Sequence, residues 1–104
     1  MGKEVKLSVA VFLIREGEYI TAYSPHLEIS GYGKDADDAM LSFDQCVEMF
    51  LEESIEKGNL HEILLKLGWK IQREGEIFSP PQIPTQFLLP MSIERRDKLF
   101  RISA

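Results

Sequence analysis

The chain has 104 residues, of which 44% are hydrophobic and 28% are charged, a composition typical of one globular domain with a modest core. A net charge of −5 argues against a surface that binds nucleic acid throughout, because phosphates repel such a surface. The longest apolar run, 9–14, is far too short to cross a bilayer, and there is a single cysteine. These features predict a cytoplasmic protein without disulfides.

Alternating apolar residues predict three antiparallel strands in the first third of the chain. Every second residue from 5 to 13 is apolar, and from 10 to 14 the intervening residues are apolar too. This pattern is expected for a strand that is covered on both faces. A turn at Gly17 leads into 19–24, which is rich in aromatic and β-branched residues, and Pro25 ends this strand. A third run over 27–33 completes a three-stranded antiparallel meander.

The periodicity changes to that of a helix after Gly33. Apolar residues from Ala36 to Ile55 fall on one stripe at helical spacing. Asp35 is the predicted N-cap, and Gly58 is the predicted C-terminal stop. We therefore expect one long amphipathic helix after the meander.

The remainder of the chain predicts smaller elements. A short second helix over 60–67 precedes a hairpin over 69–78 and a stiff, proline-rich linker over 79–84. The tail adds a strand over 85–91 and a helix over 92–102. The expected fold class is α+β, with a domain over 1–79 and an extended linker with a strand and helix over 80–104.

Ser24 and His26 suggest a nucleophile and its base. Residues two apart on a strand share a face but lie about 6.5–7 Å apart. Direct proton transfer needs roughly 2.6–3.2 Å between heavy atoms. We therefore interpret His26 as a polar residue on the surface at a strand end.

Gly31 and Gly33 match the glycine spacing of a dinucleotide-binding turn. Asp35 and two further aspartates at the start of the following helix would repel a pyrophosphate there. The glycines are instead expected to form a bulge or to allow the backbone to approach the helix closely.

Cysteine and histidine do not predict a reactive centre. Cys46 is expected to be buried at the border of the apolar stripe and to be unreactive. His26 and His61 lie far apart in the sequence without a supporting ligand pattern, so we predict no metal site and no cofactor. The chain is interpreted as a non-enzymatic binding module, with a small enzyme as an alternative.

The order of residues resembles the HicB-like antitoxin domain of type II toxin–antitoxin systems. The matching stretch, 22–53, reads AYSPHLEISGYGKDADDAMLSFDQCVEMFLEE. It holds an aromatic, small residue, proline and leucine at 23–27, a glycine, lysine and acid at 33–35, and two acids and an alanine at 37–39. The resemblance covers about 5–69 and implies a partial RNase H-like sheet with one long helix and no catalytic acid set.

The resemblance also implies a partner. Members of that family bind and block a small basic HicA toxin, an mRNA-cleaving protein. Many members also bind operator DNA through a C-terminal domain. Here the tail resembles the strand and first helix of a ribbon-helix-helix. The second helix is missing, so the resemblance does not extend to binding of operator DNA.

Acidic side chains along the long helix predict a surface that docks a basic protein by imitating phosphate charge. The predicted contacts are Asp37, Asp38, Asp44, Glu48 and Glu52, with Glu53 and Glu56 on the same surface. The alternative is a solvated helix face without a partner.

The helix leaves one face of the predicted sheet uncovered. Apolar residues of the tail are available to cover it, within one chain or between two: Phe87, Leu88, Leu89, Ile93, Leu99 and Phe100. We expect a homodimer with contacts at Phe87, Leu89, Ile93 and Phe100, because small sheets often close by symmetry. The alternative function is a stand-alone oligomeric domain of the HicB-like fold that binds an unrelated protein or ligand.

Overall fold

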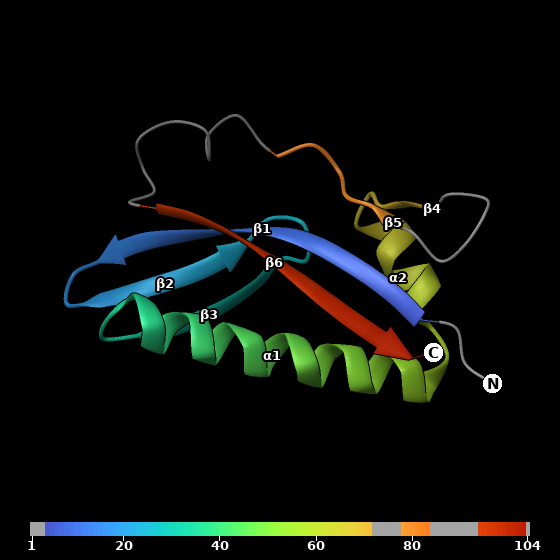
Figure 1. Ribbon diagram of the computed structural model, residues 1–104, viewed down its shortest axis with the longest axis horizontal. Helices are drawn as coiled ribbons and strands as arrows, with labels where there is room; N and C mark the ends of the chain where they lie inside the picture. The colour runs from blue at the N-terminus through green and yellow to red at the C-terminus, as the bar shows by residue number, and fades with distance from the viewer. Residues whose placement is uncertain (1–3, 72–77, 84–93, 104) are drawn as a thin grey trace.

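A computed structural model describes residues 4–71, 78–83 and 94–103 of the chain (Figure 1). The elements in chain order are β1 (Glu4–Glu16), β2 (Tyr19–Ser24), β3 (Ile29–Gly33), α1 (Ala36–Lys57), α2 (Leu60–Lys66), β4 (Lys70–Ile71), β5 (Phe78–Ser79) and β6 (Glu94–Ser103). The α+β fold class is confirmed.

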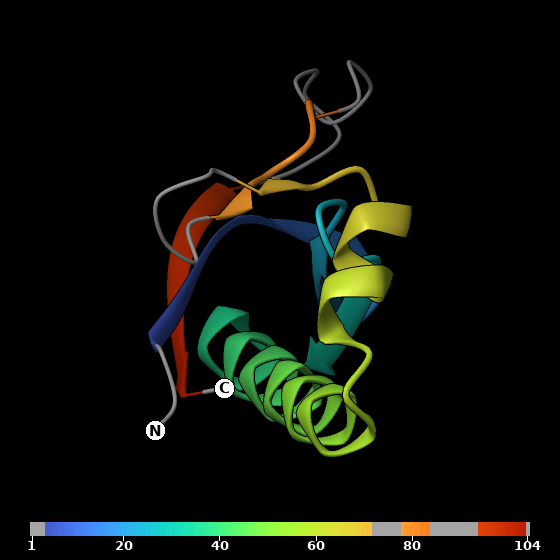
Figure 2. The same ribbon diagram turned by 90° about the vertical axis from the view of Figure 1, so that its right-hand side faces the viewer.

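The main sheet has four antiparallel strands in the order β3-β2-β1-β6. It curves around α1, with β6 and β3 at opposite sides of the helix (Figure 2). The predicted meander is confirmed as β1, β2 and β3. Both faces of β1 are covered, which explains why its sequence is apolar on both: Val9 and Val11 are buried on one face, and Ala10 and Phe12 on the other.

The helix predicted over 92–102 is wrong, because 94–103 forms β6. This strand pairs with β1 along its whole length, from Glu4 opposite Ser103 to Leu13 opposite Glu94. The long edge of β1 would otherwise leave N–H and C=O groups without strand partners, and pairing them outweighs the local helical pattern. The strand predicted over 85–91 lies outside the described residues.

The hairpin predicted over 69–78 is confirmed at its described ends, where β4 pairs antiparallel with β5. The strand predicted over 27–33 begins later than expected, at Ile29. Residues 25–28 form a turn in which Glu28 has a positive φ of 57° and donates its N–H to the Ser24 carbonyl.

Both predicted ends of α1 are confirmed. The Oδ1 of Asp35 accepts a hydrogen bond of 2.8 Å from the N–H of Asp38. Gly58 adopts the left-handed conformation, with φ 70°, and its N–H binds carbonyls of the last turn. The cap residues thus define a helix of 22 residues, from Ala36 to Lys57.

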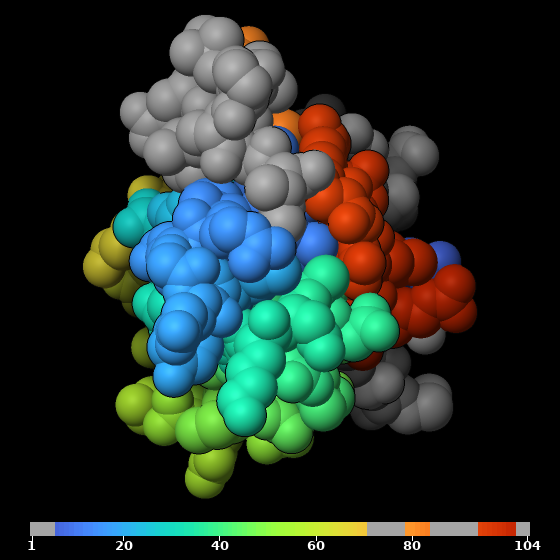
Figure 3. All heavy atoms as spheres, turned by 90° about the vertical axis from the view of Figure 1, so that its left-hand side faces the viewer, coloured from blue at the N-terminus to red at the C-terminus, as the bar shows by residue number. Residues whose placement is uncertain are grey.

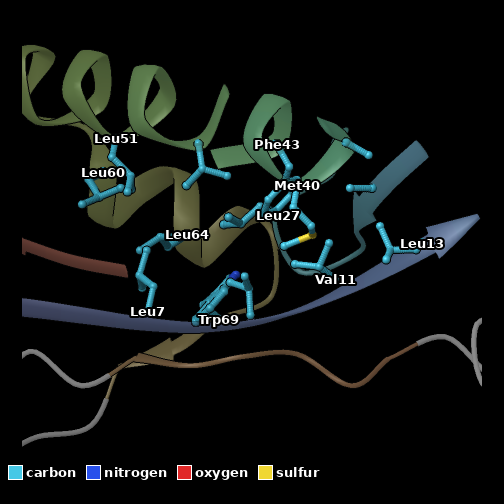
Figure 4. Close-up of a cluster of buried hydrophobic side chains, with 14 of the residues drawn as sticks. Leu7, Val11, Leu13, Leu27, Met40, Phe43, Leu51, Leu60, Leu64 and Trp69 are labelled. Atoms are coloured by element: carbon cyan, nitrogen blue, oxygen red, sulfur yellow. The ribbon is translucent and has the colours of Figure 1, made fainter. Parts of the chain in front are cut away.

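The core lies between α1 and the concave face of the sheet (Figure 4). Alternate residues of β1 meet the apolar stripe of α1, and α2 closes one end together with Trp69. The buried side chains include Leu7, Val11, Leu13, Met40, Phe43, Leu51, Leu64 and Trp69. Burial of apolar area at about 25 cal/mol per Å² provides the main driving force for this packing.

The glycines of β3 allow the close approach that was predicted. A Cβ added at Gly31 would overlap the backbone of Phe43 and lie 2.8 Å from the Ala39 carbonyl oxygen. At Gly33 it would overlap the backbone of Ala39. The side chain of Ser42 also accepts a hydrogen bond of 3.1 Å from the Tyr32 N–H. The helix therefore packs directly against the backbone of β3.

Candidate functional site

His26 lies in the interior, and its predicted surface position is wrong. Only 4% of it is exposed. Its Nδ1 accepts a hydrogen bond of 3.1 Å from the Ala10 N–H, and the Trp69 Nε1–H donates to its carbonyl at 2.8 Å. Because Pro25 ends β2, the imidazole takes the place of a strand partner for Ala10.

Burial lowers the pKa of His26, and the nearby Arg95 guanidinium lowers the pKa further. A hydrogen bond with the Pro81 backbone and the charge of Asp97 act in the opposite direction. The acceptor role of Nδ1 requires a neutral ring with its proton on Nε2. His26 is therefore a structural acceptor that joins β1 to the turn after β2.

Ser24 is fully buried, and its Oγ has no hydrogen-bond partner. Within the described part of the chain, no hydrogen bond joins Ser24 to His26. The structure thus places the two residues close in sequence but does not arrange them as a nucleophile and its base.

Cys46 is exposed, so the prediction that it is buried is wrong. The buried stripe of α1 runs through Phe43 and Val47, and position 46 falls beside that stripe. Over the described residues, no group of three or more His, Cys, Asp or Glu side chains is placed to hold a metal ion. No described helix is long and apolar enough to span a membrane.

Two of the predicted partner-binding acids contact the chain's own tail. The carboxylate of Asp44 lies 3.2 Å from the Lys98 ammonium, and that of Asp37 lies 3.6 Å from the Arg96 guanidinium. In Figure 3 the first turn of α1 is next to β6. The acidic side chains of α1 and the basic side chains of β6 therefore partly neutralise each other.

The other predicted acids point to solvent. Asp38, Glu48, Glu52, Glu53 and Glu56 are exposed, and none of them forms an ion pair with another described residue. Their carboxylates remain available to a basic partner.

Two large apolar residues are exposed among these acids. Leu41 is 60% exposed and Met49 is 65% exposed. Residues three or four apart share a helix face, so these positions belong to one surface. We define it as the outer face of α1, formed by Asp38, Leu41, Gln45, Met49, Glu52 and Glu56.

A shallow depression of about 460 Å³ extends the outer face of α1 to the sheet. Tyr19 and Tyr32 line it together with Leu41 and Gln45. Sequence reasoning missed this surface because the tyrosines come from separate strands, β2 and β3. The sequence did contain one signal of this surface, because Leu41 and Met49 are apolar and fall outside the buried stripe of α1.

The predicted oligomer contacts have different environments. Phe100 is half-buried and faces α1, with its ring centre 6.3 Å from that of Phe43. Phe87, Leu89 and Ile93 lie outside the described residues. Leu99, which follows Lys98 on β6, is 50% exposed.

In comparisons with known proteins, no family model, no curated protein and no solved structure matches this chain.

Proposed function

We propose that this chain is a non-enzymatic binding module that docks a small basic protein on the outer face of α1. The observation that carries the proposal is the exposure of Leu41 and Met49 between unpaired carboxylates. Exposed apolar side chains within a charged rim are typical of protein interfaces. Here the apolar pair supplies contact area, and the acids select a partner of opposite charge.

The resemblance to the HicB-like antitoxins supports a more specific proposal. The partner would be a HicA-like toxin that cleaves mRNA, and the module would neutralise it by covering its RNA-binding surface. Asp38, Glu52 and Glu56 would imitate the phosphates of the RNA. Asp37 and Asp44 would contribute less, because β6 already supplies cations to both.

The first test is co-expression with a small basic protein encoded beside this chain. A stable complex on affinity purification, together with rescue of cell growth, supports the antitoxin proposal. If that protein neither binds nor harms growth, the HicA-like partner is wrong, and the alternative of an unrelated partner is favoured.

The second test locates the interface by measuring association and dissociation rates at several salt concentrations. Charge reversal at Glu52 and Glu56, to lysine, should slow association about tenfold at low salt and flatten its salt dependence. Replacement of Leu41 and Met49 by serine should increase the dissociation rate about tenfold or more.

Reversal of Glu18, an exposed acid in the β1–β2 turn, is the matched control and should leave both rates unchanged. Unchanged rates for the α1 variants at every salt concentration would exclude this face as the docking surface.

A further inference from the structure

We propose that two copies of the chain associate through the outer edge of β6, so that their sheets become continuous across a two-fold axis. β6 is 10 residues long and is the outermost strand of the described sheet. The N–H and C=O groups on the outer edge of such a strand form a template for another strand. The side chains of β6 determine which strand and which register are acceptable.

The register with β1 shows which way each side chain of β6 faces. Phe100 is opposite Leu7 of the core and faces α1. Because side chains alternate along a strand, Asp97, Leu99 and Arg101 share the opposite face. A two-fold axis perpendicular to the sheet leaves every side chain on its original face of the continuous sheet. Each β6 residue must therefore lie opposite a β6 residue of the second copy whose side chain is on the same face.

One register satisfies this condition with favourable charges. When Leu99 lies on the axis opposite the second copy's Leu99, each Asp97 lies opposite an Arg101 of the other copy. The Asp97 carboxylate also lies 3.0 Å from the Arg95 guanidinium of its own chain, so it would be shared between two arginines. The half-exposed leucines then pack at the centre, with one ion pair on each side of them. Opposite charges directly across an antiparallel ladder are stabilising.

The neighbouring registers lose this complementarity. An axis at Lys98 or at Asp97 places that charged residue opposite its own copy. An axis at Arg96 opposes two arginines and shortens the ladder, and an axis at Phe100 forms no ion pair. The charges of β6 therefore act against these pairings and favour the one centred on Leu99.

A depression beside β6 gives this interface additional area. It measures about 390 Å³ and is lined by Glu48, Leu51, Ile55 and Phe100, among others. The proposed register places the second copy's Lys98 opposite Phe100, near the Glu48 carboxylate. This matters because stable interfaces usually bury more than about 1,000 Å², which one ladder of this length does not supply.

The main test is a charge-swap experiment on the full chain, measured by sedimentation equilibrium. The wild-type chain should have about twice its 11.9 kDa mass at micromolar concentration. Asp97→Arg opposes Arg101 with another cation, and Arg101→Asp opposes Asp97 with another anion. Each single variant should dimerise at least tenfold more weakly, and the double variant should regain most of the wild-type affinity.

Glu18→Arg is the matched control, because it reverses an exposed charge away from β6 and should leave the mass unchanged. Circular dichroism of each variant shows whether it is folded. A monomeric wild-type chain at 100 μM would overturn the proposal, as would equal dimerisation of all the charge variants.

Cross-linking tests the register independently. Exposed Cys46 is first replaced by serine. Leu99→Cys should then form a disulfide dimer on oxidation, because directly opposed Cα atoms lie about 4.5–5.5 Å apart. Arg95→Cys is the control, since in this register position 95 lies eight residues, about 26 Å, from its own copy and takes part in no ion pair between the copies. Equal cross-linking of both variants would exclude this register.

The dimer interface and the proposed docking face adjoin at Glu52, which belongs to the outer face of α1 and also lines the depression beside β6. The two experiments above use the chain alone, whereas loss of partner binding is measured with the partner present. Failure of one proposal would therefore be distinguished from failure of the other. The chain could dimerise without binding the basic protein, or bind the basic protein as a monomer.

Discussion

The two outer strands of the sheet are held against α1 by different forces. At β3, glycines let backbone meet backbone, and Ser42 accepts the Tyr32 N–H. At β6, Lys98 and Arg96 reach the carboxylates of α1. The β3 side therefore packs on α1 through close, neutral contacts, whereas the β6 side adds to the packing of Phe100 on Phe43 two ion pairs that water and salt weaken.

The largest expected effect is at β3. Gly31→Ala places a Cβ on the backbone of Phe43, which has no room to move, and should cost about 3 kcal/mol or more of unfolding free energy. The measurement is urea-induced unfolding. Gly17→Ala is the comparison variant. Its φ of 64° disfavours alanine, but no atom lies within 4 Å of the added Cβ, so its cost should be only about 1 kcal/mol. Equal costs would contradict the close packing.

A smaller, pH-dependent effect is expected at His26, a buried neutral side chain that lies near the charges of Arg95 and Asp97 on β6. Its folded pKa is lowered, so the unfolded chain binds the proton more readily. Stability should therefore fall as the pH decreases below about 6.5, the ordinary pKa of histidine, towards the lower folded pKa. Protonation also removes the acceptor for the Ala10 N–H.

The measurement is unfolding free energy between pH 7.5 and 5 for the wild-type chain and for His26→Gln. The variant should show a shallower fall over this range, since it lacks the group that gains a proton on unfolding. If the unfolding free energies of the two proteins had the same pH dependence, the pKa of His26 would be the same in the folded and unfolded chains, contrary to this prediction.

The smallest effect is expected at the ion pair between β6 and α1. Both side chains are partly exposed, so Lys98→Ala should cost only about 0.5–1 kcal/mol, and less at 1 M salt. Lys66→Ala is the control, because its pair with Glu62 is more exposed and should contribute close to zero. A salt-independent cost at Lys98 would show that packing of the Lys98 side chain, and not its charge pair with Asp44, provides the stabilisation.

Several local features were predictable because the residues that cause them are neighbours in the sequence. Asp35 and Gly58 define the ends of α1 through contacts within a few residues, and Pro25 ends β2 in the same way. The alternation in β1 predicted a strand covered on both faces. The close approach at Gly31 was also predictable, because only glycine permits it.

The candidate surface was only half predictable. Acidic residues on a long helix are visible in the sequence, but their neutralisation is not. Lys98 lies 54 positions from Asp44, and they meet only because β6 pairs with β1. Tyr32 reaches the depression beside Leu41 through the pairing of β3 with β2.

By itself, the sequence of this protein determined its α+β class, the first three strands and the long helix with its caps, because propensity and periodicity act over short distances. Only the tertiary structure decided that 94–103 is a strand, that His26 is buried and that Cys46 is exposed. In each case the deciding free energy comes from a partner distant in the chain: the free edge of β1, the Ala10 N–H, or the exact position of the core against α1.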